Sequence, residues 1–155
     1  MPKPRRHQPS KEELLDRLPR GLRPKLSAQQ QHDLGMTHVQ NLDAIASGQA
    51  DLQLLMDYVE QVMTWVRVAQ LLDTGVPEMM VQLEVATRLV ERYGRTGRVG
   101  FDGPDYQLAK VGLVHMDQLA SLVDEPNALA ATVWARCETN AMVKLAVQYR
   151  EKAAA

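Results

Sequence analysis

Residues 51–72 read DLQLLMDYVEQVMTWVRVAQLL, and their apolar side chains recur at alternating steps of three and four residues. That spacing places them on one face of an α-helix. The stripe consists of Leu52, Leu55, Val59, Val62, Val66 and Ala69, and it is widened by Met56 and Met63. An apolar face of this length must be covered by other helices, so the segment predicts a core helix of an all-α domain.

Helix signals flank this segment on both sides. Ser27 and Gln30 form the pattern of a capping box, which predicts a helix from Ser27 to about Ile45. Asp73-Thr74-Gly75 ends the central helix, and Pro77 suits the first turn of the next one. That third helix presents one apolar face, made of Met79, Leu83, Ala86, Val90 and Tyr93.

Two later helices follow. Asp102-Gly103-Pro104-Asp105 is a typical helix start, and the expected stripe beyond it is Leu108, Gly112, His115, Leu119 and Leu122. Asp124-Glu125-Pro126 begins the last helix, whose expected inner side is Ala130, Trp134, Cys137, Ala141 and Leu145. Short turns between these segments predict an antiparallel bundle of four to five helices. The second and third helices should form one hairpin, and the last two should form another.

Length and composition set the class of protein. A chain of 155 residues suits one domain, and its 45% apolar and 24% charged residues are typical of a soluble globular protein. No apolar run reaches the roughly eighteen residues that a membrane helix needs, and the start of the chain lacks the apolar core of a secretory signal. Cys137 is the single cysteine, which excludes an internal disulfide. We therefore expect a cytoplasmic protein.

The first 26 residues form a basic, Pro-rich arm. They contain five of the eight prolines, and eight Lys or Arg against three Asp or Glu give a net charge of +5. The other residues carry ten Lys or Arg against sixteen Asp or Glu, a net charge of −6. Prolines prevent a long helix in the arm, but Ser10 and Glu13 match a capping box that predicts a short helix to about Leu18. The expected organisation is a partly disordered arm over 1–26, a bundle domain over 27–150 and a frayed tail over 151–155.

Residues 93–105 read YGRTGRVGFDGPD and hold four of the nine glycines. Glycine-rich loops before a helix can bind phosphate through backbone amides. Here, however, Pro104 has no amide hydrogen and Asp105 would repel an anion. One interpretation is a structural connection, in which glycines supply positive φ angles while Val99 and Phe101 pack into the end of the bundle.

The second interpretation of this segment is a binding loop. Four arginines recur at steps of three or four residues, and the only acidic residue between them is Glu91. They would form a basic rim able to contact RNA, DNA or an acidic protein surface. The predicted partner-binding residues are Arg88, Arg92, Arg95, Arg98 and Phe101.

No set of residues forms a catalytic, nucleotide-binding or metal-binding signature. His32 and His38 are six residues apart, which places them on different faces of a helix and separates them as metal ligands. We expect His115 and Cys137 to face the core, as a hydrogen-bonded histidine and a small hydrophobe. The expectation is a protein that is not an enzyme and uses no cofactor or metal.

A series of short stretches suggests a relationship. A Pro- and Arg-rich start is followed by Asn41-Leu-Asp-Ala-Ile45, then by residues 92–105, then by His115-Met-Asp-Gln-Leu119. This order resembles a group of small uncharacterised helical proteins encoded on phages, plasmids and integrated mobile elements of Gram-negative bacteria. The resemblance covers about residues 1–123 and brings no catalytic residues with it. It implies an accessory role for a mobile element, in replication or transfer control or in interference with a host system.

The expected function is therefore that of a non-enzymatic accessory protein that binds a host or element-encoded protein through the loop and the arm. The alternative is a nucleic-acid-binding accessory protein that uses the arm and the Arg-rich loop. Its candidate residues are Lys3, Arg5, Arg6, Arg20, Arg23 and Lys25. A homodimer is compatible with either function, and no membrane partner is expected.

Overall fold

The computed structural model describes residues 10, 13, 17–19 and 22–155. Within these residues the chain is a bundle of five α-helices without a strand, which confirms the predicted all-α fold class. None of the helices in this part of the chain has a stretch long and apolar enough to cross a bilayer. The helices are α2 (Ala28–Ala46), α3 (Leu52–Leu72), α4 (Val76–Thr96), α5 (Gly103–Leu122) and α6 (Glu125–Ala154).

Most helices begin where the sequence places a cap. At four of them the capping side chain accepts a hydrogen bond from the backbone N–H three residues later, which satisfies an amide that the helix itself leaves free. Helix α4 instead begins after Gly75, which has a φ of 68°, and carries Pro77 in its first turn. The four side-chain caps are Ser27, Asp51, Asp102 and Asp124.

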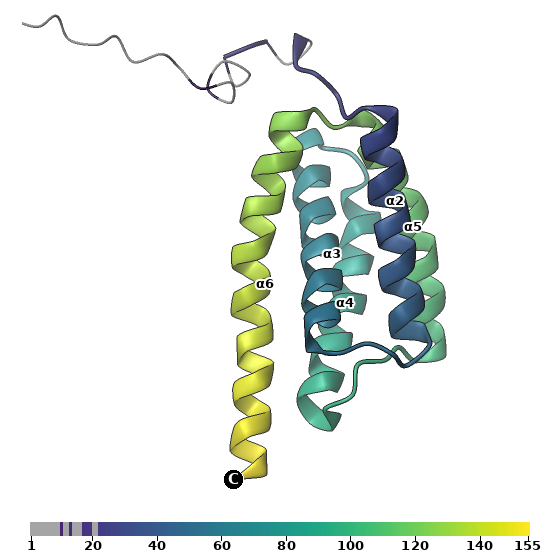
Figure 1. Ribbon diagram of the computed structural model, residues 1–155, viewed down its shortest axis with the longest axis vertical. Helices are drawn as coiled ribbons and strands as arrows, with labels where there is room; N and C mark the ends of the chain where they lie inside the picture. The colour runs from purple at the N-terminus through teal and green to yellow at the C-terminus, as the bar shows by residue number, and fades with distance from the viewer. Residues whose placement is uncertain (1–9, 11–12, 14–16, 20–21) are drawn as a thin grey trace, which may run out of the picture.

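Helix α3 lies at the centre of the bundle. It packs against each of the other four helices, with α6 along one side and α2 and α5 along the other (Figure 1). The predicted stripe is confirmed, because Leu55, Val59 and Val62 are buried, as are Met63, Val66 and Ala69. Tyr58 and Trp65, outside that stripe, are also almost fully buried. Helix α3 is therefore covered around most of its circumference.

The predicted hairpin of the last two helices is wrong. Helices α3 and α4 do form a hairpin, but α5 and α6 do not touch each other. Val123 ends α5 in an extended conformation with a ψ of 141°, and the chain crosses the end of the bundle before α6 begins. There, Lys25 pairs with Asp124 as a β-bridge and Pro24 accepts a hydrogen bond from the Glu125 N–H. Helix α6 consequently packs on α3 and α4.

The predicted inner side of α6 is also wrong. Ala130, Cys137, Ala141 and Leu145 are exposed, and Trp134 is only partly buried. Small apolar residues surround this helix, so their spacing does not select one face, whereas alanines allow close approach to α3. The residues that α6 buries are Ala131, Ala135, Thr139 and Val143.

Helix α5 departs from its predicted stripe in a similar way. Leu108 and Leu122 are exposed, and His115 is only partly buried. Gly112 and Leu119 are buried as expected, but Ala109 and Met116 join them in place of the two leucines. The inner side of α5 therefore consists largely of small residues, because α4 lies close to it.

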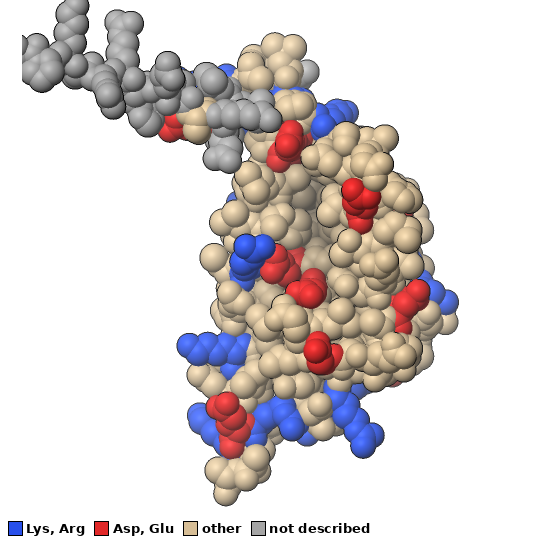
Figure 2. Space-filling model, viewed as in Figure 1, with Lys and Arg blue, Asp and Glu red and all other residues tan. Residues whose placement is uncertain are grey.

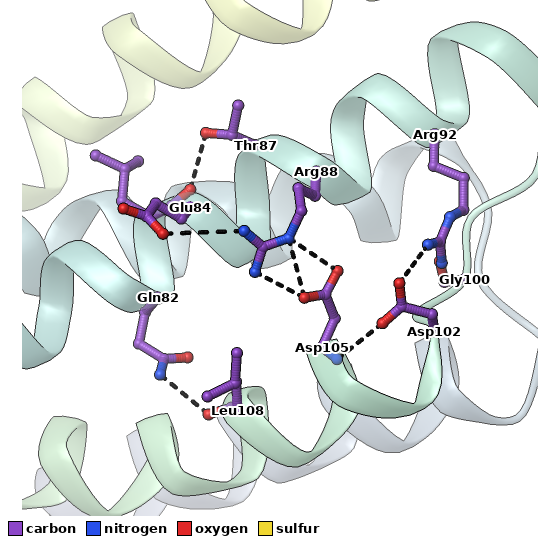
Figure 3. Close-up of polar contacts among 10 residues, drawn as sticks. Gln82, Glu84, Thr87, Arg88, Arg92, Gly100, Asp102, Asp105 and Leu108 are labelled. Atoms are coloured by element: carbon purple, nitrogen blue, oxygen red, sulfur yellow. Dashed lines mark hydrogen bonds and ion pairs between the residues drawn. The ribbon is translucent and has the colours of Figure 1, made fainter.

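Gly112 of α5 packs directly against the side chain of Gln82 on α4. A Cβ atom at this position would overlap the side-chain amide of Gln82. Gln82 is 2% exposed, and its Nε2 donates a hydrogen bond of 3.0 Å to the carbonyl oxygen of Leu108 (Figure 3). Because this amide is fixed in the core, position 112 has no room for a larger residue.

We predict that Gly112→Ala lowers the free energy of unfolding by about 1–3 kcal/mol, because the added methyl displaces Gln82. Gly35→Ala in α2 is the matched control, since a Cβ there would lie 3.4 Å from Asp117 Oδ1, an ordinary contact. Its gain in helix propensity should stabilise the protein by up to about 1 kcal/mol. Urea unfolding measures the change in unfolding free energy for each variant. Equal changes for Gly112→Ala and Gly35→Ala would contradict the packing of Gly112 against Gln82.

Candidate interaction surface

The glycine-rich segment is a structural connection between α4 and α5. Among its four glycines, only Gly97 has a positive φ, at 72°, and it ends α4. Val99 is buried, and the Phe101 ring lies 5.5 Å from the Tyr58 ring and 6.3 Å from the Tyr106 ring. The prediction that Val99 and Phe101 pack into the end of the bundle is confirmed, with Val99 buried and Phe101 partly buried.

Arg88 is held by two acidic residues, Asp105 in the first turn of α5 and Glu84 one turn earlier in α4. Its guanidinium donates three hydrogen bonds of 2.7–3.2 Å to the carboxylate of Asp105, and it lies 3.9 Å from Glu84 (Figure 3). The Asp105 side chain is 7% exposed. The hydrogen bonds from Arg88 to Asp105 raise the pKa of Arg88, and this ion pair ties α4 to α5.

Arg92 fixes the loop in the same way. It donates hydrogen bonds of 2.9 Å to the Gly100 carbonyl oxygen and to Asp102 Oδ2 (Figure 3). Hydrogen bonds from the Asp105 backbone N–H and from Arg92 hold the pKa of Asp102 below its ordinary value. Glu91 is the only acidic residue between the four arginines in the sequence, but in the structure Arg88 and Arg92 pair with Asp105 of α5 and with its N-cap Asp102.

Arg95 and Arg98 remain available on the surface. Both are exposed, and neither side chain makes a hydrogen bond or ion pair within the described residues. Lys and Arg side chains gather at the lower end of the molecule in Figure 2, around the last turns of α6. Of the four arginines in the predicted basic rim, only Arg95 and Arg98 are therefore available to a partner, and they lie beside the C-terminal part of α6.

An apolar groove runs between α4 and α6 next to Arg95. It has a volume of about 460 Å³ and is open to solvent. Leu145 and Tyr149 on its α6 side are 68% and 60% exposed, so two large hydrophobic residues face water. We call it the α4/α6 groove, and it is lined by Thr87, Val90, Glu91, Gly94, Arg95, Met142, Leu145, Ala146 and Tyr149.

Contacts made by Gly94 and by Arg150 hold the walls of this groove together. The Cβ position of Gly94 lies 3.6 Å from Ala146 Cβ, so α4 and α6 meet there through small residues. The Arg150 guanidinium lies 5.5 Å from the centre of the Tyr93 ring and packs against Gly97. It also donates a long hydrogen bond of 3.4 Å to the Tyr93 carbonyl oxygen. The groove is therefore built on fixed helices.

The basic arm lies mostly outside the described residues, including Lys3, Arg5, Arg6 and Arg20. Ser10 and Glu13 form the predicted capping box, with hydrogen bonds of 2.9 and 3.2 Å. Arg23 donates a hydrogen bond to the Leu18 carbonyl oxygen, and Lys25 joins the bridge to Asp124. Nucleic-acid binding by the arm stays a prediction.

A second hollow, which the sequence did not predict, lies over α3 between α2 and α6. Its volume is about 460 Å³, and most of its lining residues are polar. The signal in the sequence is a set of polar residues at helical spacing inside apolar stripes, His38 and Asn41 on α2 and Gln61 on α3. We call this hollow the polar cleft. Its lining comprises Leu34, Thr37, His38, Asn41, Gln53, Asp57, Glu60, Gln61, Thr64, Trp65, Val68, Ala128, Thr132 and Arg136.

His115 and Cys137 do not come together. They lie on α5 and α6, which do not contact each other, and Cys137 is exposed instead of buried. His115 borders a separate small hollow with Thr74 and Gly75. Within the described residues, no group of three His, Cys, Asp or Glu side chains is placed to hold a metal ion.

No protein-family model, curated protein or solved structure matches the chain.

His38 gives the stability of the protein a specific pH dependence. Burial lowers the pKa of His38 from its ordinary 6.5 to about 4. Between these values the unfolded chain binds a proton that the folded protein does not, so stability is complete above about pH 6.5 and falls as the pH drops toward 4.

Between about pH 7 and pH 4.5 this histidine alone should cost roughly 2–3 kcal/mol of unfolding free energy. We predict that His38→Gln, whose amide can still accept the Trp65 hydrogen bond, removes that part of the loss. Urea unfolding of both proteins at the two pH values measures it. The other charges of the cleft, Asp57, Glu60 and Arg136, are common to both proteins. Parallel pH profiles would contradict a buried neutral His38.

Proposed function

We propose that this protein is a non-enzymatic accessory protein that acts by binding another protein, and that the α4/α6 groove is its binding surface. The observation that carries the proposal is the pair Leu145 and Tyr149, which are mostly exposed beside an open apolar groove. Contiguous apolar surface of this kind is typical of protein-binding sites. A role in a phage or plasmid, including interference with a host system, stays a prediction from the resemblance.

The shape of the groove favours a helix as the bound element. Helices α4 and α6 form its walls and run in the same direction, since Gly94 faces Ala146 and Gly97 faces Arg150. An amphipathic helix can place one apolar face between such walls. Tyr149 suits this role, because tyrosine combines apolar area with a hydroxyl group and is enriched at interfaces. Met142 adds a flexible side chain that adapts to the shape of a bound residue.

The charges around the groove favour an acidic partner. Arg95 lines the groove and makes no ion pair with any residue that the structure describes, and Arg98 is exposed just after the end of α4. Glu91 is the one acidic residue among the lining residues. A partner helix with Asp or Glu beside its apolar face would pair with these arginines, which mainly accelerates association and selects the partner.

Nucleic-acid binding by the loop receives less support. Arg88 and Arg92 form ion pairs with Asp105 and Asp102. Arg95 and Arg98 are therefore the two arginines of the predicted rim that remain available to a partner. Residues 27–155 also carry a net charge of −6. Phosphate binding depends on several neutralising contacts, so the arm, and not the bundle, would have to provide them.

We predict that Leu145→Glu abolishes capture of the partner while leaving the fold intact, because Leu145 is mostly exposed. Affinity capture from cells that naturally contain the protein should lose the partner by about tenfold or more, as expected for a central interface residue. Arg95→Glu should weaken capture at low salt and have a smaller effect at high salt.

Val114→Glu on α5 is the matched control, because Val114 is 56% exposed and lies away from the groove. This variant should capture the same proteins as the wild type. Identical sets of captured proteins for Leu145→Glu and Val114→Glu would remove the groove from the proposal, whereas capture that nuclease treatment abolishes would favour the nucleic-acid alternative.

A further inference from the structure

Helix α6 lies at the edge of the bundle, and among the described helices it packs only on α3 and α4 (Figure 1). Its side that faces away from them still carries apolar residues, mostly at steps of three and four, which is the spacing of one helix face. We call this side the outer strip, and it consists of Leu129, Ala130, Val133, Cys137 and Ala141. None of these residues lines the α4/α6 groove or the polar cleft.

The outer strip is exposed along its whole length. Leu129 is 53% exposed and Val133 is 58% exposed, and the other three residues also face solvent. Isolated exposed hydrophobic residues are common, whereas a contiguous strip of them is typical of an interaction surface. Arg136 and Glu138 flank the strip on opposite sides, because successive residues of a helix are about 100° apart. The strip itself therefore carries no charge.

Charges at the two ends of the outer strip favour a second copy of this chain as its partner. Glu125 lies in the first turn of α6, and Lys144 is exposed just beyond the strip. Neither side chain forms an ion pair with a residue that the structure describes. An antiparallel second α6 that places Lys144 opposite Pro126 brings its ammonium group next to Glu125. The strip is thus complementary to itself under two-fold symmetry, and antiparallel helix dipoles also attract each other.

The sizes of the side chains fit the same register. In an antiparallel pair, each step forward along one helix is a step backward along the other. In this register Val133 therefore faces Cys137 of the second copy, and Leu129 faces Ala141. Each larger side chain meets a small one, so the two helices can pack closely.

We propose that the protein forms a two-fold symmetric homodimer through the outer strip, with the two copies of α6 antiparallel. The ion pair between Lys144 and Glu125 forms twice, once at each end of the interface. The apolar strip between these pairs is removed from water, which supplies the main driving force for association. Because the strip shares no residue with the α4/α6 groove, dimerisation and partner binding can be tested separately.

Analytical ultracentrifugation of the full-length protein under reducing conditions measures the dimer. We expect a Kd below about 100 μM for the wild type. Val133→Glu should raise the Kd by about tenfold or more, because it places a charge at the centre of an apolar interface. Val114→Glu on α5 is the matched control, since Val114 is 56% exposed, and it should leave the Kd unchanged. Equal effects of the two substitutions would overturn the proposal.

A charge exchange tests the ion pair at the ends of the strip. Lys144→Glu should raise the Kd about three- to tenfold at low ionic strength, because it brings two carboxylates together. Adding Glu125→Lys to this variant should restore most of the lost affinity, since the two charges are then exchanged. A double variant that dimerises no better than Lys144→Glu would overturn the antiparallel arrangement.

Disulfide formation reports the direction of the two helices. Leu129→Cys and Ala141→Cys are prepared separately in a Cys137→Ser background, then mixed and mildly oxidised. The antiparallel register predicts mainly disulfides between the two different variants, identified by mass spectrometry. Disulfides mainly between two copies of the same variant would show a parallel pair and overturn the proposal.

Two further results decide between a second copy and another occupant of the strip. A wild-type protein that stays monomeric up to about 500 μM, a range that includes weak dimers, would overturn the proposal. Loss of a captured cellular protein in Val133→Glu from such a monomer would assign the strip to a different partner. In the dimer, Val133→Glu should still capture the partner that Leu145→Glu loses, so failure of either proposal leaves the other standing.

Discussion

Helix α3 carries apolar side chains around most of its circumference, and removing them from water requires neighbours on every side. The other four helices all pack on it. Burial of apolar surface is the main favourable term in folding, so this requirement sets the positions of α2, α4, α5 and α6. It also places α5 and α6 on different sides of α3, although they are consecutive in the chain. The crossing at Val123 and Asp124 is the consequence.

Both the polar cleft and the α4/α6 groove follow from this arrangement. Because α2 and α6 flank α3 without meeting, the polar cleft remains between them, with α3 as part of its wall. Helix α6 has 30 residues against 21 in α4, and its last turns extend past the other helices (Figure 1). Leu145 and Tyr149 are exposed alongside the last turns of α4, because Ala146 packs against Gly94 and Arg150 packs against Gly97. The loop of Arg92, Gly97 and Asp102 then fixes Arg95 and Arg98 at the margin of the α4/α6 groove.

The sequence predicts the helices well and their faces unevenly. In α3 and α4 the predicted Val59, Met79 and Val90 are buried, but large residues outside the predicted stripes, such as Trp65 and Leu89, are buried as well. In α5 and α6 the contacts are made by glycine and alanine, whose small side chains give a weak periodic signal.

Phe101 was correctly expected inside. The ion pairs of Arg88 and Arg92 were missed because Asp105 and Asp102 also match a helix cap, and a cap pattern does not show what else a carboxylate contacts. Predicting the polar cleft requires the information that α2 and α6 do not contact each other, and no local sequence pattern contains that information.

The most direct test is to determine which face of α6 packs against α4. The Cβ positions of Gly94 and Ala146 lie 3.6 Å apart, a separation that suits a disulfide. In a Cys137→Ser background, Gly94→Cys combined with Ala146→Cys should form an intramolecular disulfide under mild oxidation, detected by mass spectrometry and by faster migration without reductant. Gly94→Cys combined with Leu145→Cys should form it far less, because Leu145 is mostly exposed. Preferential bridging of the Leu145 pair would place the predicted stripe inside, and it would contradict both the groove and the arrangement of helices described here.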